Sequence, residues 1–193
     1  MRQVTLLGKI PLITSPWHDF VGNKDKIVDL CLRLEIPKKI ESNIAVGAKS
    51  NLWESDFNFL ESHEELNDLK LWLIQESTAL INNFNNSNYR AVIIESWAHV
   101  TRSGGFHKPH HHTGSTWSGI FHIDGELNKG GSNNWYLPYY MERKPGLEFA
   151  HDRFTIDASP GNLILFPSML LHDADVYLGS KPRIVIAYNS ICL

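Results

Sequence analysis

Cysteine is scarce in this sequence, since Cys31 and Cys192 are the only two in 193 residues. Two cysteines exclude a disulfide scaffold and a cysteine-rich zinc site, and they fit the reducing cytoplasm, where we expect the protein to reside. Long apolar runs are missing as well. None approaches the roughly 18 residues of a membrane span, and the N-terminus lacks the charged and then apolar profile of a signal peptide. We therefore expect no membrane partner.

Positive charge is not in excess either. The 18 Lys and Arg against 21 Asp and Glu give a formal net charge of −3, and no Lys/Arg cluster stands out. Nucleic acid is therefore not expected as a partner. The 42% of hydrophobic residues exclude a disordered chain. Because no repeat or low-complexity tract divides the sequence, we expect one domain over residues 1–193, in which 1–88 supports a core formed by 89–193.

Helical periodicity is confined to the first half of the chain. Apolar residues recur at helical spacing in Asn23 to Leu34, and a Ser-x-x-Glu capping box opens a second candidate helix, Ser62 to Phe84. From Tyr89 onward the pattern changes to short runs rich in Val, Ile and aromatic residues, separated by Gly and Pro turns. These candidate strands include Ala91 to Val100, Trp117 to Ile123, Gly161 to Pro167 and Ile184 to Tyr188. The order predicts a mainly β fold, an antiparallel barrel or sandwich with N-terminal helices laid on it.

The segment Gly125 to Asp157 interrupts this pattern. Its Gly, Asn and Pro content predicts a long loop over the mouth of the barrel, where it could act as a lid; a disordered segment is the alternative. Four aromatic residues of this loop would suit an aromatic or peptide-like substrate, or would simply anchor the loop: Trp135, Tyr136, Tyr139 and Tyr140.

Ten histidines are the most unusual feature of the composition. Six of them fall between His99 and His122, and four lie in the internal stretch 107–112. Neutral imidazole is the commonest metal ligand near neutral pH because it keeps a lone pair. In an extended segment, residues i and i+2 project to the same face, so His110 and His112 can bind one metal ion together. A histidine loop that binds metals adventitiously is the alternative interpretation.

A metal site needs a third ligand, and His172 is the best candidate. It follows the apolar run Leu163 to Leu171, and taken alone it would be interpreted as a histidine of the core. Together with the upstream His-x-His it becomes the third ligand. Five other histidines are expected at ordinary polar positions: His18, His63, His107, His111 and His151.

Arg183 begins the last apolar strand. Alternation places three further residues on its face: Val185, Ala187 and Asn189. A guanidinium that faces the interior of a barrel must be paired, because an isolated buried charge is very unfavourable. A dicarboxylate ligand would provide a bidentate, charge-assisted pair. An internal salt bridge with Asp173 or Asp175 would serve equally well.

Taken together, these residues resemble the iron(II)/2-oxoglutarate-dependent oxygenases. The closer likeness is to the 2OG-Fe(II) oxygenase family with an H-x-H-P-x-S-x-x-SG core, which stands here as residues 110–119. The likeness spans roughly Ser50 to Asn189. Two positions depart from the family pattern: Thr113 replaces the proline after the second histidine, and Val185 replaces a serine two residues after the arginine.

The resemblance implies a double-stranded β-helix, also called a jelly-roll or cupin-like barrel, with flanking N-terminal helices. It also implies an Fe(II)- and 2-oxoglutarate-dependent enzyme that uses O2 to hydroxylate an amino-acid, peptide or small natural-product substrate, with release of succinate and CO2. The metal ligands would be His110, His112 and His172. Arg183 would hold the distal carboxylate of 2-oxoglutarate.

Inward alternation from the two ligand histidines would put Ser118, Ile120 and His122 toward the same cavity. Trp97 and His99 would line it from the neighbouring strand. Among these and the residues of the last strand, Ser118 and Asn189 are the candidates for polar contacts to 2-oxoglutarate.

Alternatives remain for the ligands and for the function. Non-heme iron oxygenases usually combine two histidines with a carboxylate, which Asp124 or Glu126 could supply if His112 does not bind. The function could instead be that of a three-histidine cupin dioxygenase or isomerase without 2-oxoglutarate. A jelly roll that binds a metal or small molecule without turnover is the non-enzymatic alternative.

Overall fold

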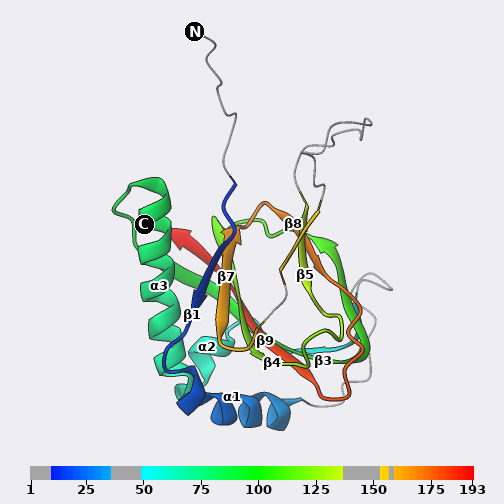
Figure 1. Ribbon diagram of the computed structural model, residues 1–193. Coiled ribbons are helices and arrows are strands. Elements are labelled where there is room, and N and C mark those ends of the chain that lie inside the picture. Colours follow the sequence, from blue (N-terminus) through cyan, green and yellow to red (C-terminus); the bar gives the residue numbers. More distant parts are fainter. Residues whose placement is uncertain (1–9, 36–48, 137–152, 157–158) are drawn as a thin grey trace, which may run out of the picture.

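The computed structural model of the protein describes residues 10–35, 49–136, 153–156 and 159–193. In these residues, nine strands form one antiparallel sheet in the order β1-β7-β4-β9-β3-β8-β5-β6, with β2 paired to β3 beside this path. The strands are β1 Ile13–Pro16, β2 Lys49–Glu54, β3 Ala91–His110, β4 Trp117–Asp124, β5 Asn133–Tyr136, β6 Arg153–Ile156, β7 Asn162–Pro167, β8 Leu171–Ala174 and β9 Arg183–Cys192. The sheet curls, so that β7 and β4 lie across an open interior from β5 and β8 (Figure 1).

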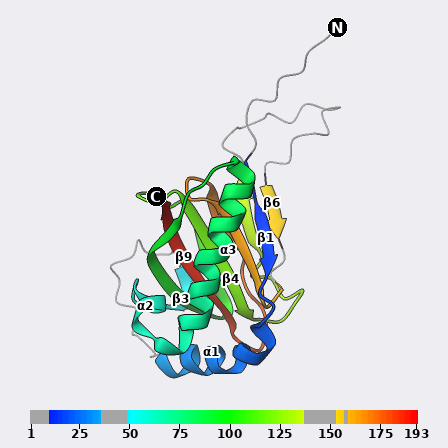
Figure 2. The same cartoon turned by 90° about the vertical axis from the view of Figure 1, so that its left-hand side faces the viewer.

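The helices lie outside this curl. They are α1 Phe20–Leu34, α2 Phe59–Ser62 and α3 Asn67–Asn85, with a 3-10 turn, η1, at Glu64–Leu66. Figure 2 shows α3 running across the outer face of the sheet and α1 lying beneath it. Apolar side chains of the helices and of the outer sheet face form the larger core; among them are Ile27, Leu30, Leu69, Leu73, Phe121 and Ile186. Along the described parts of the chain, no helix has the length and apolarity needed to cross a membrane.

The mainly β fold with N-terminal helices is therefore confirmed, but the second helix differs from its prediction. Ser62 ends α2 instead of opening a long helix, and its side chain caps neither η1 nor α3. The capping box fails because the Ser62 N–H already bonds to the Asn58 carbonyl, inside the preceding helix. The apolar spacing of Leu69 and Leu73 correctly predicted a helix, α3, and both side chains are fully buried.

One strand boundary also differs. The strand predicted to end at Val100 continues as β3 to His110, because its second half pairs with β2 and β8 after the pairing with β9 has ended. The strand predicted at Gly161 to Pro167 is confirmed as β7, and the apolar run that precedes His172 does not continue as one strand. It breaks at a turn after Pro167, and His172 is the second residue of β8.

The predicted loop Gly125 to Asp157 contains two strands. β5 pairs with β8 on one side and β6 on the other, and the side chain of Trp135 in β5 is buried. Four-residue strands are too short for a reliable alternation signal, so their partners determine them. Residues 137–152 and 157–158 of this segment lie outside the described residues.

One glycine lets the sheet and α3 pack closely. Gly119 of β4 lies opposite Tyr188 of β9, and a β-carbon at Gly119 would overlap the tyrosine ring. The Tyr188 hydroxyl reaches past it to Ser77 of α3, at an oxygen–oxygen distance of 2.6 Å. This buried hydrogen bond joins the helix to the sheet directly behind the concave face.

Candidate functional site

The concave face of the sheet lines a cavity that opens to solvent, with about 500 Å³ of space when the part open to solvent is included. Its wall includes six residues that strand alternation predicted to face inward: Trp97, His99, Ser118, Ile120, Val185 and Ala187. This part of the prediction is confirmed, because side-chain direction in a strand follows from local period alone.

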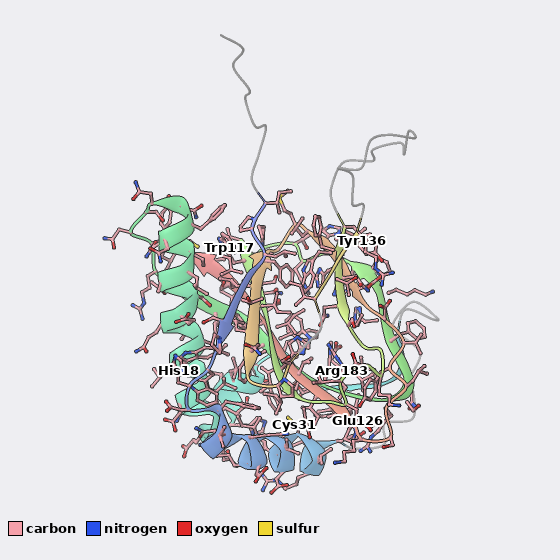
Figure 3. All side chains as sticks on the ribbon, viewed as in Figure 1. His18, Cys31, Trp117, Glu126, Tyr136 and Arg183 are labelled. Carbon is pink, nitrogen blue, oxygen red and sulfur yellow. The ribbon has the colours of Figure 1, made fainter. Side chains whose placement is uncertain are left out.

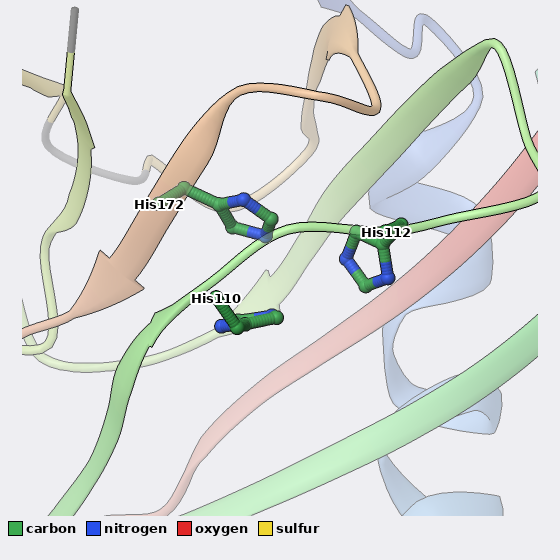
Figure 4. Close-up of side chains that lie close together, drawn as sticks. All are labelled: His110, His112 and His172. Atoms are coloured by element: carbon green, nitrogen blue, oxygen red, sulfur yellow. The ribbon is translucent and has the colours of Figure 1, made fainter. Parts of the chain in front are cut away.

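Three histidines meet at one end of this cavity. His110 and His172 lie opposite each other in the β3–β8 pairing, and His112 lies two residues beyond the end of β3. One ring nitrogen from each can be chosen so that all three lie within 4.8 Å of one another. Figure 4 shows the three rings facing a common space. The structure thus brings together the three residues that were predicted as metal ligands, although they come from segments sixty residues apart.

Backbone carbonyl groups orient two of the rings. Nδ1 of His110 lies 2.9 Å from the carbonyl oxygen of Lys108, and Nδ1 of His172 lies 2.9 Å from that of Leu170. A carbonyl oxygen only accepts, so each Nδ1 carries the proton and each Nε2 keeps its lone pair. Such contacts to the second nitrogen are typical of metal-binding histidines.

The third ring is fixed by its surroundings. The backbone N–H of His112 donates to the Ser168 carbonyl, and the Trp97 ring lies 5.5 Å from the imidazole, centre to centre. Nδ1 of His112 lies 3.5 Å from the amide nitrogen of Asn189. His112 therefore keeps its place although it lies beyond the end of β3.

Burial keeps two of these imidazoles neutral. Burial, and next the neighbouring His110, lower the pKa of His112 to about 4 and that of His172 to about 3. Neutral rings offer lone pairs, so the cluster is ready to bind a cation at neutral pH.

Arg183 lies on the same concave face, inside the curve of the sheet (Figure 3). It is 6% exposed, and its Nη2 donates to Oδ1 of Asn133 at 2.8 Å. Burial lowers the pKa of this guanidinium to about 10. The predicted alternative, a salt bridge with Asp173 or Asp175, is absent from the described residues. Asp173 accepts from Asn134 and Tyr136, while Asp175 pairs with Arg153.

Two glycines make room for the arginine. Gly131 has φ +73°, and a β-carbon there would lie 2.8 Å from Cδ of Arg183. A β-carbon at Gly125 would lie 3.4 Å from its Cγ. The backbone after β4 therefore packs directly against the arginine stem, and at Gly131 only a residue without a side chain allows this approach.

Ser118 and Asn189 form a buried pair at the histidine end of the cavity. The Ser118 hydroxyl donates to Oδ1 of Asn189 at 2.8 Å, and Nδ2 of Asn189 donates to Glu95 at 2.9 Å. Asn189 lies beside His112, six positions along β9 from Arg183. The predicted role of Ser118 and Asn189 as contacts to a cosubstrate stays a prediction.

The carboxylates weighed as alternative ligands are engaged elsewhere. Asp124 forms an ion pair with Lys24 at 2.8 Å, and Glu126 accepts from the backbone N–H of Lys181 at 2.8 Å. Both border a second, smaller cavity on the other side of Arg183. In the described residues, the group of three histidines contains no carboxylate.

The aromatic residues of the segment after β4 anchor it. Trp135 is buried and packs edge-on against Phe166 at 5.4 Å between ring centres, while Tyr136 donates to Asp173. Tyr139 and Tyr140 lie outside the described residues.

Sequence reasoning missed several residues of the site. His107, expected at an ordinary polar position, lines the cavity, and its ring lies 4.0 Å from that of His110. Glu54 of β2 was not considered at all, and its Oε2 lies 2.6 Å from Nε2 of His99 in β3. His18 and His111 are exposed as expected, and His151 lies outside the described residues. The missed positions depend on the pairing of β2 with β3, which no local pattern reveals.

Three buried side-chain atoms on the described residues have no hydrogen-bond partner. They are Oγ1 of Thr101, Nε2 of His122 and Nε1 of Trp135. Thr101 lies opposite Arg183, His122 opposite Val185 and Trp135 opposite His172, so each belongs to the concave face. The signal for Thr101 was present, because it shares the alternation of Trp97 and His99.

The comparisons with known proteins agree with this geometry. Residues 95–189 match the model of the family described as "Putative 2OG-Fe(II) oxygenase". Among curated proteins, none matches the chain.

Three solved structures are similar to this chain in fold. A 2OG-Fe(II) oxygenase family oxidoreductase from Burkholderia pseudomallei has a TM-score of 0.64 at 11% identity, covering 93% of this chain and 84% of its own. A prolyl-4-hydroxylase from Pseudomonas putida has a TM-score of 0.59 at 15% identity, covering 92% of each chain. HygX from Streptomyces hygroscopicus, solved with nickel and 2-oxoglutarate, has a TM-score of 0.63 at 10% identity, covering 94% and 82%.

At these identities the solved structures support the jelly-roll fold, and the family model supports the kind of enzyme. The matched segment begins at Glu95 in β3 and ends at Asn189 in β9, so it includes all three histidines and Arg183. Residues 95–189, which are 95 of the 193 residues, thus match the 2OG-Fe(II) oxygenase family.

Proposed function

We propose that this protein uses Fe(II) and 2-oxoglutarate to hydroxylate an amino-acid, peptide or small natural-product substrate, with His110, His112 and His172 as metal ligands. One observation carries the proposal. Three imidazoles converge at one end of a cavity whose wall also holds Arg183, a buried cation without a carboxylate partner among the described residues. A metal-chelating acid with a second carboxylate complements both features.

The residues present fit such a metal. Imidazole nitrogen is an accepted ligand for iron, although three histidines replace the usual two histidines and one carboxylate. The chemistry that Fe(II) supplies in this family is the activation of dioxygen, coupled to the oxidative decarboxylation of 2-oxoglutarate.

The chain's own residues bind and orient. The carbonyl groups of Lys108 and Leu170 hold two imidazoles in the tautomer that leaves Nε2 available. Arg183 offers its remaining N–H donors to a carboxylate. The apolar wall residues Trp97, Ile120 and Val185 limit water in the cavity. No protein group is needed as a general base.

The substrate class and the location remain parts of the proposal. The prolyl-4-hydroxylase of Pseudomonas putida is named for a prolyl substrate, and the SnoN epimerase has been solved with a nogalamycin ligand, so the fold accommodates peptide and natural-product chemistry. A cytoplasmic location is supported by the two cysteines, which are both free.

The first test is whether the purified protein couples 2-oxoglutarate to dioxygen. We expect anaerobic addition of Fe(II) and then 2-oxoglutarate to produce a visible absorption band, and exposure to air to produce succinate. A band and succinate would support the proposal. Oxidation of a substrate without 2-oxoglutarate would favour the three-histidine cupin enzyme, and neither signal would favour a binding protein without turnover.

The ligand set is tested by exchanging histidines. His172→Ala should abolish stoichiometric metal binding, because two ligands alone form a weak site, while His111→Ala should retain it, since His111 is exposed. Metal content after dialysis, measured by elemental analysis, reports the difference. Full metal content in the His172 variant would contradict the three-histidine assignment.

A further inference from the structure

One wall of the cavity, beside the three histidines, combines an imidazole–carboxylate pair with aromatic rings. His99 of β3 lines the cavity, and its Nε2 lies 2.6 Å from Oε2 of Glu54, the residue opposite it in β2. The side chains of the pair are 12% and 17% exposed. A carboxylate only accepts, so Nε2 of His99 donates, and an imidazole backed by a carboxylate faces the cavity.

Aromatic rings lead from the surface to the metal ligands beside this pair. Trp97 comes two residues before His99 on the same face, lines the cavity and lies 5.5 Å from the His112 ring, centre to centre. Phe57 is 55% exposed and packs edge-on against Trp97 at 5.4 Å. These two rings offer a large apolar contact area to a molecule that enters the cavity at this point.

Glu95 marks the open end of the same face. It lies opposite Asn189 in the β3–β9 pairing, it is exposed, and it accepts from Nδ2 of Asn189 at 2.9 Å. A carboxylate thus lies on each side of Trp97, since Glu95 precedes it along the strand and Glu54 follows it through the pair with His99.

The charges of the cavity favour a cation at this wall. Among the described residues that line the cavity, Arg183 is the one Lys or Arg, and in the proposed function it binds the cosubstrate. Carboxylates form charge-assisted hydrogen bonds with ammonium groups, and an indole ring attracts a cation within about 6 Å of its centre. A carboxylate accepts up to about four hydrogen bonds, so the bond from His99 does not prevent Glu54 from accepting another.

We propose that the substrate that is hydroxylated carries a protonated amine, which binds at this wall between the Glu54–His99 pair and Trp97. Glu54 determines the preference for the cation over a neutral molecule of the same shape. The inference rests on the proposed function and names the substrate class of the same cavity. A basic side chain of a peptide and a small amine present the same ammonium group.

A purely structural pair is the competing explanation. The hydrogen bond between Glu54 and His99 also joins β2 to β3 across 45 residues of sequence. In that case replacing Glu54 would change the stability of the fold and would affect charged and neutral ligands alike.

The experiment compares probes that differ only in the exchange of an ammonium group for a hydroxyl, on the protein loaded with Fe(II) and 2-oxoglutarate under argon. Paramagnetic broadening of the probe's proton NMR signals reports binding near the metal, and a titration gives the Kd. Butylammonium and butanol form one pair. N-acetyl-lysine methylamide and N-acetyl-6-hydroxynorleucine methylamide form the other, which represents a peptide side chain. In at least one pair the ammonium probe should bind about tenfold or more tightly than its neutral partner.

Matched variants assign this preference to Glu54. Glu54→Gln should remove most of it while the Kd of the neutral probe changes little, and Glu54→Asp should restore part of it because the charge is kept. Glu65→Gln should leave the preference unchanged, since Glu65 pairs with Arg33 on elements outside the sheet. If Glu54→Gln does not fold, His99→Gln removes the imidazole of the pair and should lower the preference as well.

Each result has one meaning. Equal Kd values within both pairs would overturn the inference, and so would a preference that persists in Glu54→Gln. In either case a normal visible band of the Fe(II)–2-oxoglutarate complex would leave the proposed function intact. No band, together with no broadening of any probe, would overturn the proposed function and the inference together.

Discussion

At the residue scale, Gly119 shows that a glycine is required where β4 packs against the Tyr188 ring behind the site. Its backbone lies against the Tyr188 ring, which in turn reaches Ser77 of α3. Ser118, the residue before it, points into the cavity and donates to Asn189. The two faces of β4 at this point therefore serve packing and ligand binding respectively.

We expect Gly119→Ala to destabilise the protein by roughly 1–3 kcal/mol, because the added β-carbon displaces the tyrosine ring in a filled core. Urea unfolding followed by circular dichroism measures the change. Gly22→Ala is the control. A β-carbon at Gly22 meets nothing within 4 Å, so this helical substitution should stabilise by up to about 1 kcal/mol. Equal effects of the two variants would contradict the packing argument.

At the scale of elements, α3 supports the sheet from outside and contributes no side chain to the cavity wall. Its inner residue Leu73 is fully buried, whereas Leu71 is 56% exposed. The helix thus affects stability through the outer core, and the histidines lie on the opposite side of the sheet.

Leu73→Ala should cost about 2–5 kcal/mol of folding free energy through the cavity that it leaves. Leu71→Ala should change stability by less than about 0.5 kcal/mol, as an exposed substitution. Chemical unfolding measures both. The metal affinity of the folded protein should be the same in both variants; a large loss of affinity in Leu73→Ala would show that α3 also shapes the histidine cluster.

The elements also show what could be predicted from the sequence. Alternation identified the inward faces of β4 and β9, since a period of two residues is a local property. The end of β7 at Pro167 was predicted, but the strand β5 and the continuation of β3 to His110 were not, because they depend on pairing with β8. His107 was misjudged for the same reason. The inward direction of Thr101 could have been predicted from alternation, although a threonine alone does not indicate a functional site.

At the scale of the whole molecule, buried neutral histidines link folding stability to pH. His122 has a folded pKa well below 6.5 because of burial and of Arg183, the charged group that faces it. The unfolded chain binds a proton on this histidine near pH 6.5, while the folded chain does not. The stability contributed by the neutral ring is therefore complete above pH 6.5 and is lost as the pH falls.

We expect the unfolding free energy to fall with decreasing pH below 6.5, with His122 contributing up to about 1.4 kcal/mol per pH unit. His122→Gln removes this contribution, so its stability should fall less steeply; above pH 7 the two slopes should agree. Urea unfolding of the metal-free proteins between pH 4.5 and 8 tests this. His112 and His172 contribute the same way in both proteins and cancel in the comparison. Parallel curves would show that His122 accepts a proton in the folded state.

The length of β3 has a consequence for how tightly a ligand can be held. This one strand carries Thr101 opposite Arg183 and also His110 opposite His172, so the two ends of the cavity share a continuous backbone within the sheet. The conformational entropy of bringing them together is lost when the chain folds, before any ligand arrives. The cavity is thus preorganised, and the free energy of ligand contacts there can appear as affinity instead of being offset by the closure of a hinge.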